Sequence, residues 1–312
     1  MDWVGIIGFR HEVAHTGVLR ALLETGDAAS VARALTGNEH IETVGEPQQE
    51  ARLRERVRRS VDLAANLTLD DGSRGSLAVE VKVDSAWSLK QLREMTPEDA
   101  HGVLLALGHT ALMASPSDLA SLTEYARPWR LVGPAEWASI VRRATSSEVF
   151  ATYARSLEVE ADDHERARTR VREGSRANFG RHPQTLEHWA YFAEIAAGAG
   201  DGLRWERKTL ISGPLQTLWL PEWSDGGPYL ELMGHGSKRV LCAKVWSTQG
   251  TLPERQRLVA DGLADFEGRA GKRPSARDKT CTARSWTLDA LSPLAASRLI
   301  GELEGAIRAL VP

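Results

Sequence analysis

The stretch Arg52–Met95 limits most strongly what this chain can fold into, because it contains two runs of alternating side chains. In residues 76–83, apolar side chains take every second position, and alternation with β-branched residues predicts a half-buried strand. Residues 57–69 alternate in the same way, and the turn-forming residues 70–75 separate the two runs. The stretch is therefore predicted to contain a β-hairpin.

Three charged side chains are expected on one face of this hairpin. Glu80 and Lys82 are two residues apart, so both point to the same side of their strand. A turn centred near Asp71 or Gly72 places Asp62 across the ladder from Glu80 or Lys82, with the Cβ atoms of Asp62 and Glu80 about 4.5–8 Å apart. Two carboxylates this close repel unless a cation lies between them or one binds a proton. A hard divalent ion, Mg²⁺ or alternatively Mn²⁺, meets that need, and Lys82 would then hold or deprotonate an attacking water.

This constellation resembles the PD-(D/E)XK nuclease superfamily. The resemblance rests on Asp62, on the sequence Glu80-Val81-Lys82 and on Gln91-Leu92 in the segment that follows. Val61 stands where the nominal motif has proline, a position that is commonly relaxed in the superfamily. The resemblance implies an α/β core with a mixed sheet flanked by helices. It also implies Mg²⁺-dependent hydrolysis of phosphodiester bonds, in which the Asp and Glu bind the ion and the Lys assists the attacking water.

The resemblance extends to the N-terminal part of the chain. Residues 12–23 are similar to the first helix of one large bacterial branch, in which an acidic residue precedes a Leu-rich helix that packs behind the sheet. The resemblance gives Glu12 and Gln91 supporting catalytic roles beside Asp62, Glu80 and Lys82. The metal ligands that it implies are Asp62, Glu80, the backbone carbonyl of Val81 and, as a further acidic position, Glu46.

Four arginines precede the hairpin at alternating positions. They are Arg52, Arg54, Arg56 and Arg58, and a strand would place them on the same face as Asp62. One interpretation is a row of guanidinium groups that follows a nucleic-acid backbone toward the metal. The other is a solvated basic face, and the pattern does not choose between them.

The composition sets wider limits. The formal net charge is −3, so a nucleic-acid site would have to be a local basic stripe rather than a global property. The two cysteines, Cys242 and Cys281, form no CxxC motif, which predicts a reduced, cytoplasmic protein. No segment approaches the roughly 20 apolar residues of a membrane span, so no membrane association is expected.

Changes in pattern along the chain predict three parts. Residues 1–145 form the nuclease-like domain, residues 146–200 form a helical connector, and residues 201–312 form an α+β domain. The connector contains a long charged helix over residues 146–173, which would bridge domains or face solvent. In the last part, a basic cluster at residues 269–279 is either a phosphate-contacting loop or a solvated surface.

A competing motif lies near the N-terminus. His11-Glu12-Val13-Ala14-His15 matches H-E-x-x-H, which on a helix would bind Zn²⁺ and make the chain a metallopeptidase. Only ten residues precede the motif, and Arg20 and Ala21 stand where the extended pattern would lead to a third histidine. The zinc peptidase is therefore the less favoured alternative.

The function predicted from these patterns is a Mg²⁺-dependent DNA endonuclease. A second class stays open, namely a nucleic-acid-binding or assembly subunit that keeps the nuclease fold with latent catalysis. Relatives in the bacterial branch are often restriction-type or phage-defence nucleases, which implies an antiviral role and a partner protein of a defence system. For the second domain, the sensing of a trigger and the formation of a homodimer both remain open.

Overall fold

The chain is described by a computed structural model that covers the following residues: 12–25, 27–53, 60–85, 89–95, 97, 100–114, 119, 129–174, 186–198, 204–210, 213–219, 227–235, 238–246, 252–275 and 277–310. For residues 204–210 and 213–219 the backbone alone is described. The chain divides into two compact units, Met1–Glu165 and Arg166–Pro312. The three-part division expected from the sequence stays a prediction.

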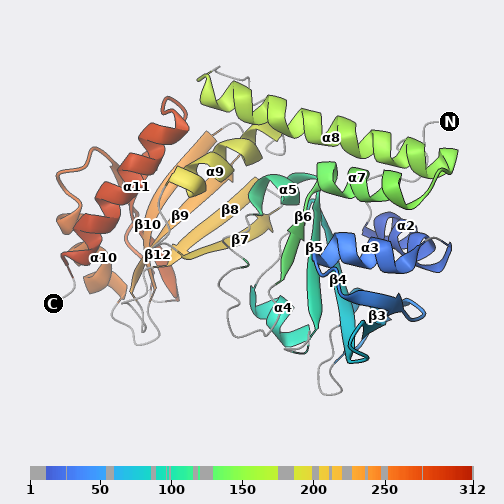
Figure 1. Cartoon of the computed structure of the whole chain (residues 1–312). Helices are drawn as coiled ribbons and strands as arrows, with labels where there is room; N and C mark the ends of the chain where they lie inside the picture. The colour runs from blue at the N-terminus through green and yellow to red at the C-terminus, as the bar shows by residue number, and fades with distance from the viewer. Residues whose placement is uncertain are drawn as a thin grey trace. The chain divides into compact units, whose positions relative to one another are not determined.

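The first unit is built on a mixed sheet (Figure 1). Its strands are β1 (Ile41–Val44), β2 (Gln48–Ala51), β3 (Val61–Leu69), β4 (Arg74–Val83), β5 (His101–Leu107) and β6 (Arg130–Val132). The order is β1-β3-β4-β5-β6, and β2 also pairs with β3. Pairing is antiparallel from β1 to β4 and parallel from β4 to β6. The predicted α/β class with a mixed sheet flanked by helices is confirmed.

The helices of this unit are α2 (Glu12–Thr25), α3 (Ala28–Thr36), α4 (Leu89–Met95), α5 (His109–Met113), α7 (Pro134–Ala144) and α8 (Glu148–Arg172). Capping side chains account for some helix ends. The Asp27 carboxylate accepts a hydrogen bond from the Ser30 N–H at 3.0 Å at the start of α3. Gly37 ends α3 in the left-handed conformation, with φ of 70°.

The predicted hairpin is present as β3 and β4. In the observed register, Leu63 pairs with Val79 and Thr68 with Arg74, so residue numbers sum to the value expected for a turn at Asp71. The expectation of a half-buried strand was wrong for the end of β4, where residues 77–83 are buried on both faces. The alternation therefore separates two buried faces, each covered by a different set of side chains, rather than a buried face and a solvent-exposed face.

Two hydrophobic clusters provide these covers. The larger contains the odd-numbered row of β4 together with side chains of α2, α3, α7 and α8. The smaller contains Ala78 with Leu92 and Met95 of α4 and Leu104 of β5. Glu80 and Lys82 continue the face of Ala78, so they lie beyond the smaller cluster in a partly closed environment. The fold thus places two charged groups where water is largely excluded.

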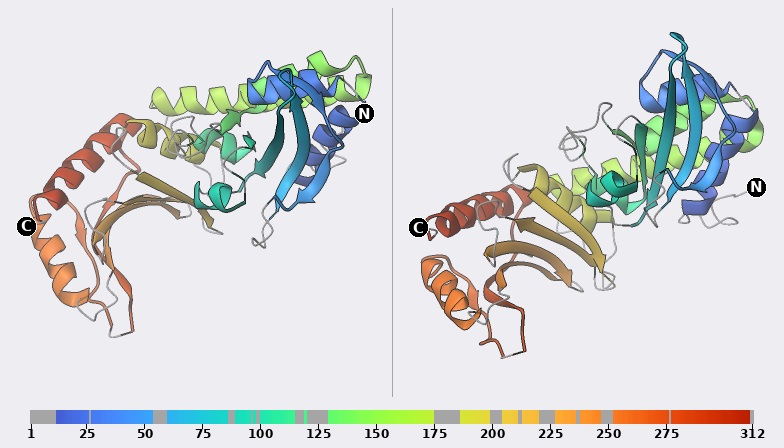
Figure 2. Two further views of the ribbon diagram at one scale, coloured as in Figure 1. Left: turned by 60° about the horizontal axis from the view of Figure 1, so that its bottom comes forward. Right: turned by 90° about the horizontal axis from the view of Figure 1, so that it is seen from below.

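The second unit is built on an antiparallel sheet of order β11-β12-β10-β9-β8-β7, whose strands curve in Figure 2. The strands are β7 (Arg204–Leu210), β8 (Gly213–Trp219), β9 (Pro228–His235), β10 (Lys238–Trp246), β11 (Arg269–Ala270) and β12 (Thr280–Thr287). The helices are α9 (Leu186–Gly198), α10 (Leu252–Gly262) and α11 (Pro293–Arg308). Strands β7–β10 pair in chain order as an antiparallel meander. No described helix is long and apolar enough to cross a membrane.

Candidate active site

The candidate site lies where β3 and β4 stop pairing. The last paired residues are Leu63 and Val79, and the same register continued by one residue sets Asp62 opposite Glu80. Instead of pairing with the β3 backbone, the Val81 N–H donates to Asp62 Oδ2 at 2.7 Å. The hairpin therefore brings Asp62 to the face that carries Glu80, as the alternation predicted.

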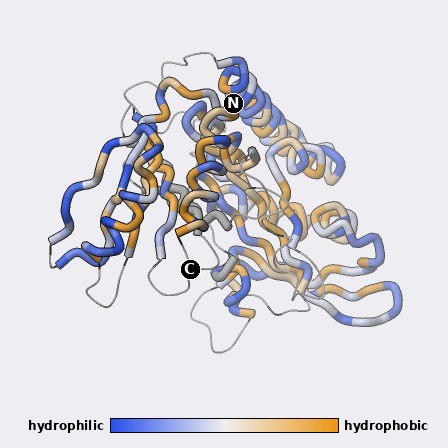
Figure 3. The backbone as a smooth tube through the Cα atoms, turned by 90° about the vertical axis from the view of Figure 1, so that its left-hand side faces the viewer, coloured by the Kyte–Doolittle hydropathy of each residue, from blue (hydrophilic) through white to orange (hydrophobic). Residues whose placement is uncertain are grey.

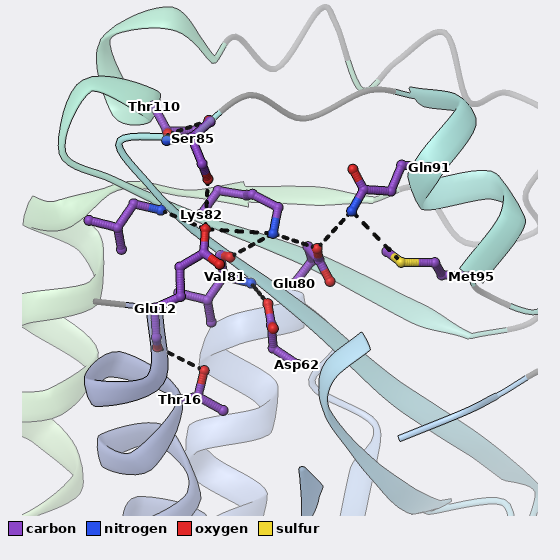
Figure 4. A network of polar contacts seen from close by, with 11 residues as sticks. Glu12, Thr16, Asp62, Glu80, Val81, Lys82, Ser85, Gln91, Met95 and Thr110 are labelled. Atoms are coloured by element: carbon purple, nitrogen blue, oxygen red, sulfur yellow. Dashed lines mark hydrogen bonds and ion pairs between the residues drawn. The ribbon is translucent and has the colours of Figure 1, made fainter. Parts of the chain in front are cut away.

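Lys82 is the hub of the polar network in Figure 4. Its Nζ lies 2.6 Å from Glu80 Oε1 and 3.7 Å from Glu12 Oε1. The same ammonium donates to the Val81 carbonyl oxygen at 3.1 Å. Lys82 is buried, and Glu80 is only 3% exposed, so these contacts act in a medium that weakens charge less than water does.

Glu12 reaches the site from the start of α2. Its Oε1 accepts hydrogen bonds from Ser85 Oγ at 2.6 Å and from the Val83 N–H at 3.4 Å. Ser85 is itself held by Thr110, since the Ser85 N–H donates to Thr110 Oγ1 and Thr110 Oγ1 donates to the Ser85 carbonyl. The chain just after β4 thus anchors the acidic residue of α2 beside Lys82.

Gln91 approaches the same carboxylate from α4. Its Nε2 donates to Glu80 Oε1 at 3.2 Å and lies 3.9 Å from Met95 Sδ (Figure 4). The Glu80 oxygen Oε1 therefore receives both the ammonium and the amide. The sequence placed Gln91 beside Lys82 or a substrate phosphate, and the structure places it on Glu80.

Burial and mutual repulsion raise the pKa values of the carboxyl groups. Desolvation is the largest cause for Glu80 and raises its pKa to about 7, although the charge of Lys82 acts against this shift. Desolvation also raises the pKa of Asp62, while the hydrogen bond from Val81 and the charge of Lys82 lower it. Burial alone would lower the pKa of Lys82, but the attraction and hydrogen bond of Glu80 outweigh burial, and this pKa is raised. An ammonium thus already serves as the counter-charge of an acidic cluster.

The carboxylate oxygens at the site are of the type that a hard cation prefers as ligands. Glu12, Asp62 and Glu80 supply only oxygen, and Glu80 Oε2 is buried without a hydrogen-bond partner. As arranged, no group of three or more His, Cys, Asp or Glu side chains in the described part of the chain stands close enough to hold a metal ion. The side chains converge on the Lys82 ammonium instead. An ion at these oxygens would therefore compete with Lys82 for Glu80.

Two other predicted positions lie at the surface. Glu46 is exposed between β1 and β2, and no contact among the described residues links it to Asp62, Glu80 or Lys82. Arg52 is exposed just after β2. Arg54, Arg56 and Arg58 lie outside the described residues. The structure therefore leaves the proposed arginine row and the role of Glu46 as predictions.

Glu50 is an acidic neighbour that the sequence did not indicate. It lies in β2 between Gln49, which pairs with Leu63, and Ala51, which pairs with Val61, so it flanks Asp62. Its charge contributes to the raised pKa of Asp62, and its backbone is left-handed, with φ of 50°. This conformation is uncommon for a residue other than glycine and recurs at functional sites. A positive φ at a residue of this type has no clear sequence signal.

The histidine motif divides between two environments. His11 lies outside the described residues. His15 is fully buried, and its Nδ1 lies 2.6 Å from the Tyr153 hydroxyl oxygen. Because the Trp137 Nε1–H donates to that same oxygen, the hydroxyl proton is available to His15 Nδ1. Glu12 points to β4 rather than to His15, so the described part of the motif serves packing and the candidate site separately.

Comparisons with protein-family models, with curated proteins and with solved structures gave no match. The assignment of chemistry to this chain therefore rests on its own residues and geometry.

Proposed function

We propose that the chain is a divalent-metal-dependent nuclease with a PD-(D/E)XK-type core that hydrolyses phosphodiester bonds in DNA. The observation that carries the proposal is the meeting of three carboxylates and one buried ammonium at the end of a β-hairpin. Asp62, Glu80 and Lys82 come from β3 and β4, and Glu12 comes from α2. The resemblance implies a helix, three strands, a helix and a strand in that order, and the described elements run α2, α3, β1–β4, α4 and β5.

Asp62, Glu80 and the Val81 carbonyl are the groups that would hold the ion, with Glu12 as a supporting carboxylate. A bound Mg²⁺ or Mn²⁺ would supply charge neutralisation and an acidified water. The raised pKa values of Asp62 and Glu80 are consistent with this proposal, because burial first and neighbouring carboxylates second disfavour their ionised forms, which an added positive charge would favour.

Lys82 and Gln91 are the groups left for substrate. When Glu80 turns to an ion, the Lys82 ammonium is free to hold the attacking water and to offset negative charge on the phosphorus-bound oxygens. Gln91 keeps Glu80 oriented through its amide. The restriction-type or phage-defence role remains a prediction that no observation here tests.

The proposal is tested by incubating plasmid DNA with Mg²⁺ or Mn²⁺ and the wild-type chain, Asp62→Asn or Lys82→Gln. We expect each substitution to lower cleavage by about 10²–10⁴-fold, the contribution of a positioned acid–base group. Asp71→Asn, in the exposed turn of the same hairpin, and Lys238→Gln, on the exposed start of β10, are the matched controls. Cleavage that persists at the control rate in both site variants would contradict the proposed roles.

Calorimetric titration with Mn²⁺ separates metal binding from catalysis. Asp62→Asn should weaken binding, whereas Lys82→Gln should leave it unchanged or tighten it, because the competing ammonium is gone. Tight DNA binding by the wild-type chain without cleavage under either metal would favour the binding-subunit alternative.

A further inference from the structure

The second unit carries an unbalanced group of positive charges, which we call the basic loop and define as residues 269–279. Its basic side chains are Arg269, Lys272, Arg273, Arg277 and Lys279, and all are exposed. Asp278 is the one acidic residue of the loop, so five positive charges and one negative charge leave a net +4. The whole chain carries −3, so the loop is a local reversal of sign.

The backbone of the loop is tied at several points. Gln256 of α10 donates from Nε2 to the Lys272 and Thr282 carbonyl oxygens, each at 2.8 Å, and so joins the two limbs of the loop. The Gly271 N–H donates to the Ala283 carbonyl at 2.9 Å, and a Cβ on Gly271 would lie 1.7 Å from the Thr282 carbonyl oxygen. These hydrogen bonds hold this part of the loop backbone in place without a partner.

The carboxylate inside the loop is also engaged. Asp278 Oδ2 accepts a hydrogen bond from the Ser275 N–H at 2.7 Å, and the Asp278 N–H donates to the Ser275 carbonyl at 3.2 Å. Its side chain therefore closes a turn rather than pairing with a lysine or arginine. None of the five basic side chains forms an ion pair with a carboxylate among the described residues.

Several arginines elsewhere on the surface, though not all of them, are paired with carboxylates. They form ion pairs in Arg20–Glu24, Arg142–Glu158, Arg170–Glu187, Arg172–Glu194 and Arg308–Glu304. The loop is distinguished by having five such cations close together in sequence, where their charges repel one another. Their counter-charge must come from outside this part of the chain.

We propose that the basic loop is a second polynucleotide-binding surface, which contacts the phosphate backbone without reading sequence. Three of its five cations are arginines, whose guanidinium groups match phosphate oxygens in pairs. The loop has no large apolar side chain to enter a lipid surface, as membrane-binding segments usually do. Figure 3 colours the backbone by the hydropathy of each residue, on which scale Lys and Arg are strongly hydrophilic.

The inference goes beyond the proposed function, because binding by the loop needs neither metal nor cleavage. It is tested by fluorescence anisotropy of a labelled DNA duplex with EDTA present, at several salt concentrations. The test variant changes the five basic residues of the loop to Gln in the full chain. The control changes Arg20, Arg142, Arg170, Arg172 and Arg308 to Gln, which alters net charge equally.

We expect the loop variant to bind at least roughly tenfold more weakly than the control near 100 mM salt. The slope of log K against log salt should also fall in magnitude by about 0.9 for each lost phosphate contact. A melting curve for each variant checks folding. Equal affinities and slopes for the loop variant and the control would overturn the inference. The inference would also be overturned if the loop variant lost binding to anionic phospholipid vesicles but bound DNA as the control does.

The two proposals can fail separately. If loop-dependent binding is seen without cleavage under any metal, the nuclease assignment fails and this inference stands. If Asp62 and Lys82 prove essential for cleavage but the loop variant binds as the control does, the nuclease assignment stands and the loop is a solvated surface.

Discussion

Lys82 carries the charge balance of the candidate site. Its ammonium contacts Glu80 and Glu12 directly and the Val81 carbonyl through a hydrogen bond. A buried cation of this kind is costly unless carboxylates surround it, and the carboxylates are costly unless the cation is present. The group is therefore poised for exchange, since a divalent ion can replace the ammonium as the counter-charge of Glu80.

Gly108 has a more local role beside the site. Its φ of 56° and ψ of −143° lie in a region that other residues rarely adopt, and a Cβ there would lie 2.2 Å from Asp84 Oδ1. The same Asp84 oxygen accepts the His109 N–H at 2.6 Å. The junction between β5 and α5 therefore needs a residue without a side chain.

We expect Gly108→Ala to lower the free energy of unfolding by about 2–4 kcal/mol, from backbone strain and loss of the Asp84 contact. Gly72→Ala is the control, because Gly72 also has positive φ (79°) but has nothing within 4 Å of its Cβ position. The control should lose about 1–2 kcal/mol. Urea unfolding measures both, and equal losses would contradict the steric argument.

Single residues also show what sequence reasoning can and cannot reach. Strand alternation predicted Asp62 on the face of Glu80 and Lys82 and left both as its opposite residue, and the observed register continues to Glu80. Ser85 and Glu50 were not predictable, because each becomes relevant only through contacts between segments far apart in the chain. The local sequence pattern determines which face of a strand carries a residue. The packing of distant segments determines which side chains that residue contacts.

Among the secondary-structure elements, α8 runs from one compact unit into the other and also contributes to a buried core. Its charged sequence predicted a helix that bridges domains or faces solvent, yet Ala154 and Leu157 are fully buried in the larger cluster of the first unit. Glu160 is also drawn inward, and its Oε1 accepts the Gly108 N–H at 2.6 Å. Helix α8 thereby supports the end of β5 from outside the sheet.

Glu160 should make stability depend on pH. Desolvation raises its pKa to about 7, the Gly108 hydrogen bond lowers it, and Asp84 and Asp163 raise it further. The folded state then holds a proton that the unfolded state releases near pH 4.5. The contribution of Glu160 to stability is therefore fully present below about pH 4.5 and is lost as the pH rises to about 7. The loss is at most about 3 kcal/mol.

Glu160→Gln keeps an oxygen for Gly108 but cannot ionise, so its unfolding free energy should be flatter across that range and higher at pH 8. His164, whose Nε2 lies 3.9 Å from Glu160 Oε1, favours the ionised form when it is protonated and is present in both proteins. Asp162→Asn, at an exposed position of α8, is the control and should keep the wild-type profile. Chemical unfolding at pH 5, 6, 7 and 8 decides between these outcomes.

The whole molecule is organised as two compact units with separate sheets. The sequence indicated both sheets, because alternating and apolar runs mark most of their strands. The boundary between the two units falls inside α8, between Glu165 and Arg166. The sequence of a helix does not show that its two ends pack into different cores.

Two units with their own buried cores should unfold in two steps. We expect calorimetry to show two transitions, with Leu77→Ala lowering one and Leu241→Ala the other, each by about 2–5 kcal/mol, because both side chains are buried in different sheets. A single transition that moves with both substitutions would show that the units unfold as one.

The course of α8 also governs how the chain can be cut. Residues 154 and 157 of this helix belong to the first core, whereas Ala167 and Val171 are buried in the second unit. A fragment that ends within the helix loses part of the apolar packing of one unit. A fragment that keeps the whole helix exposes the apolar side chains that the missing unit would bury. Truncated versions are therefore prone to precipitate, and intact material is the sounder reagent for biochemical work.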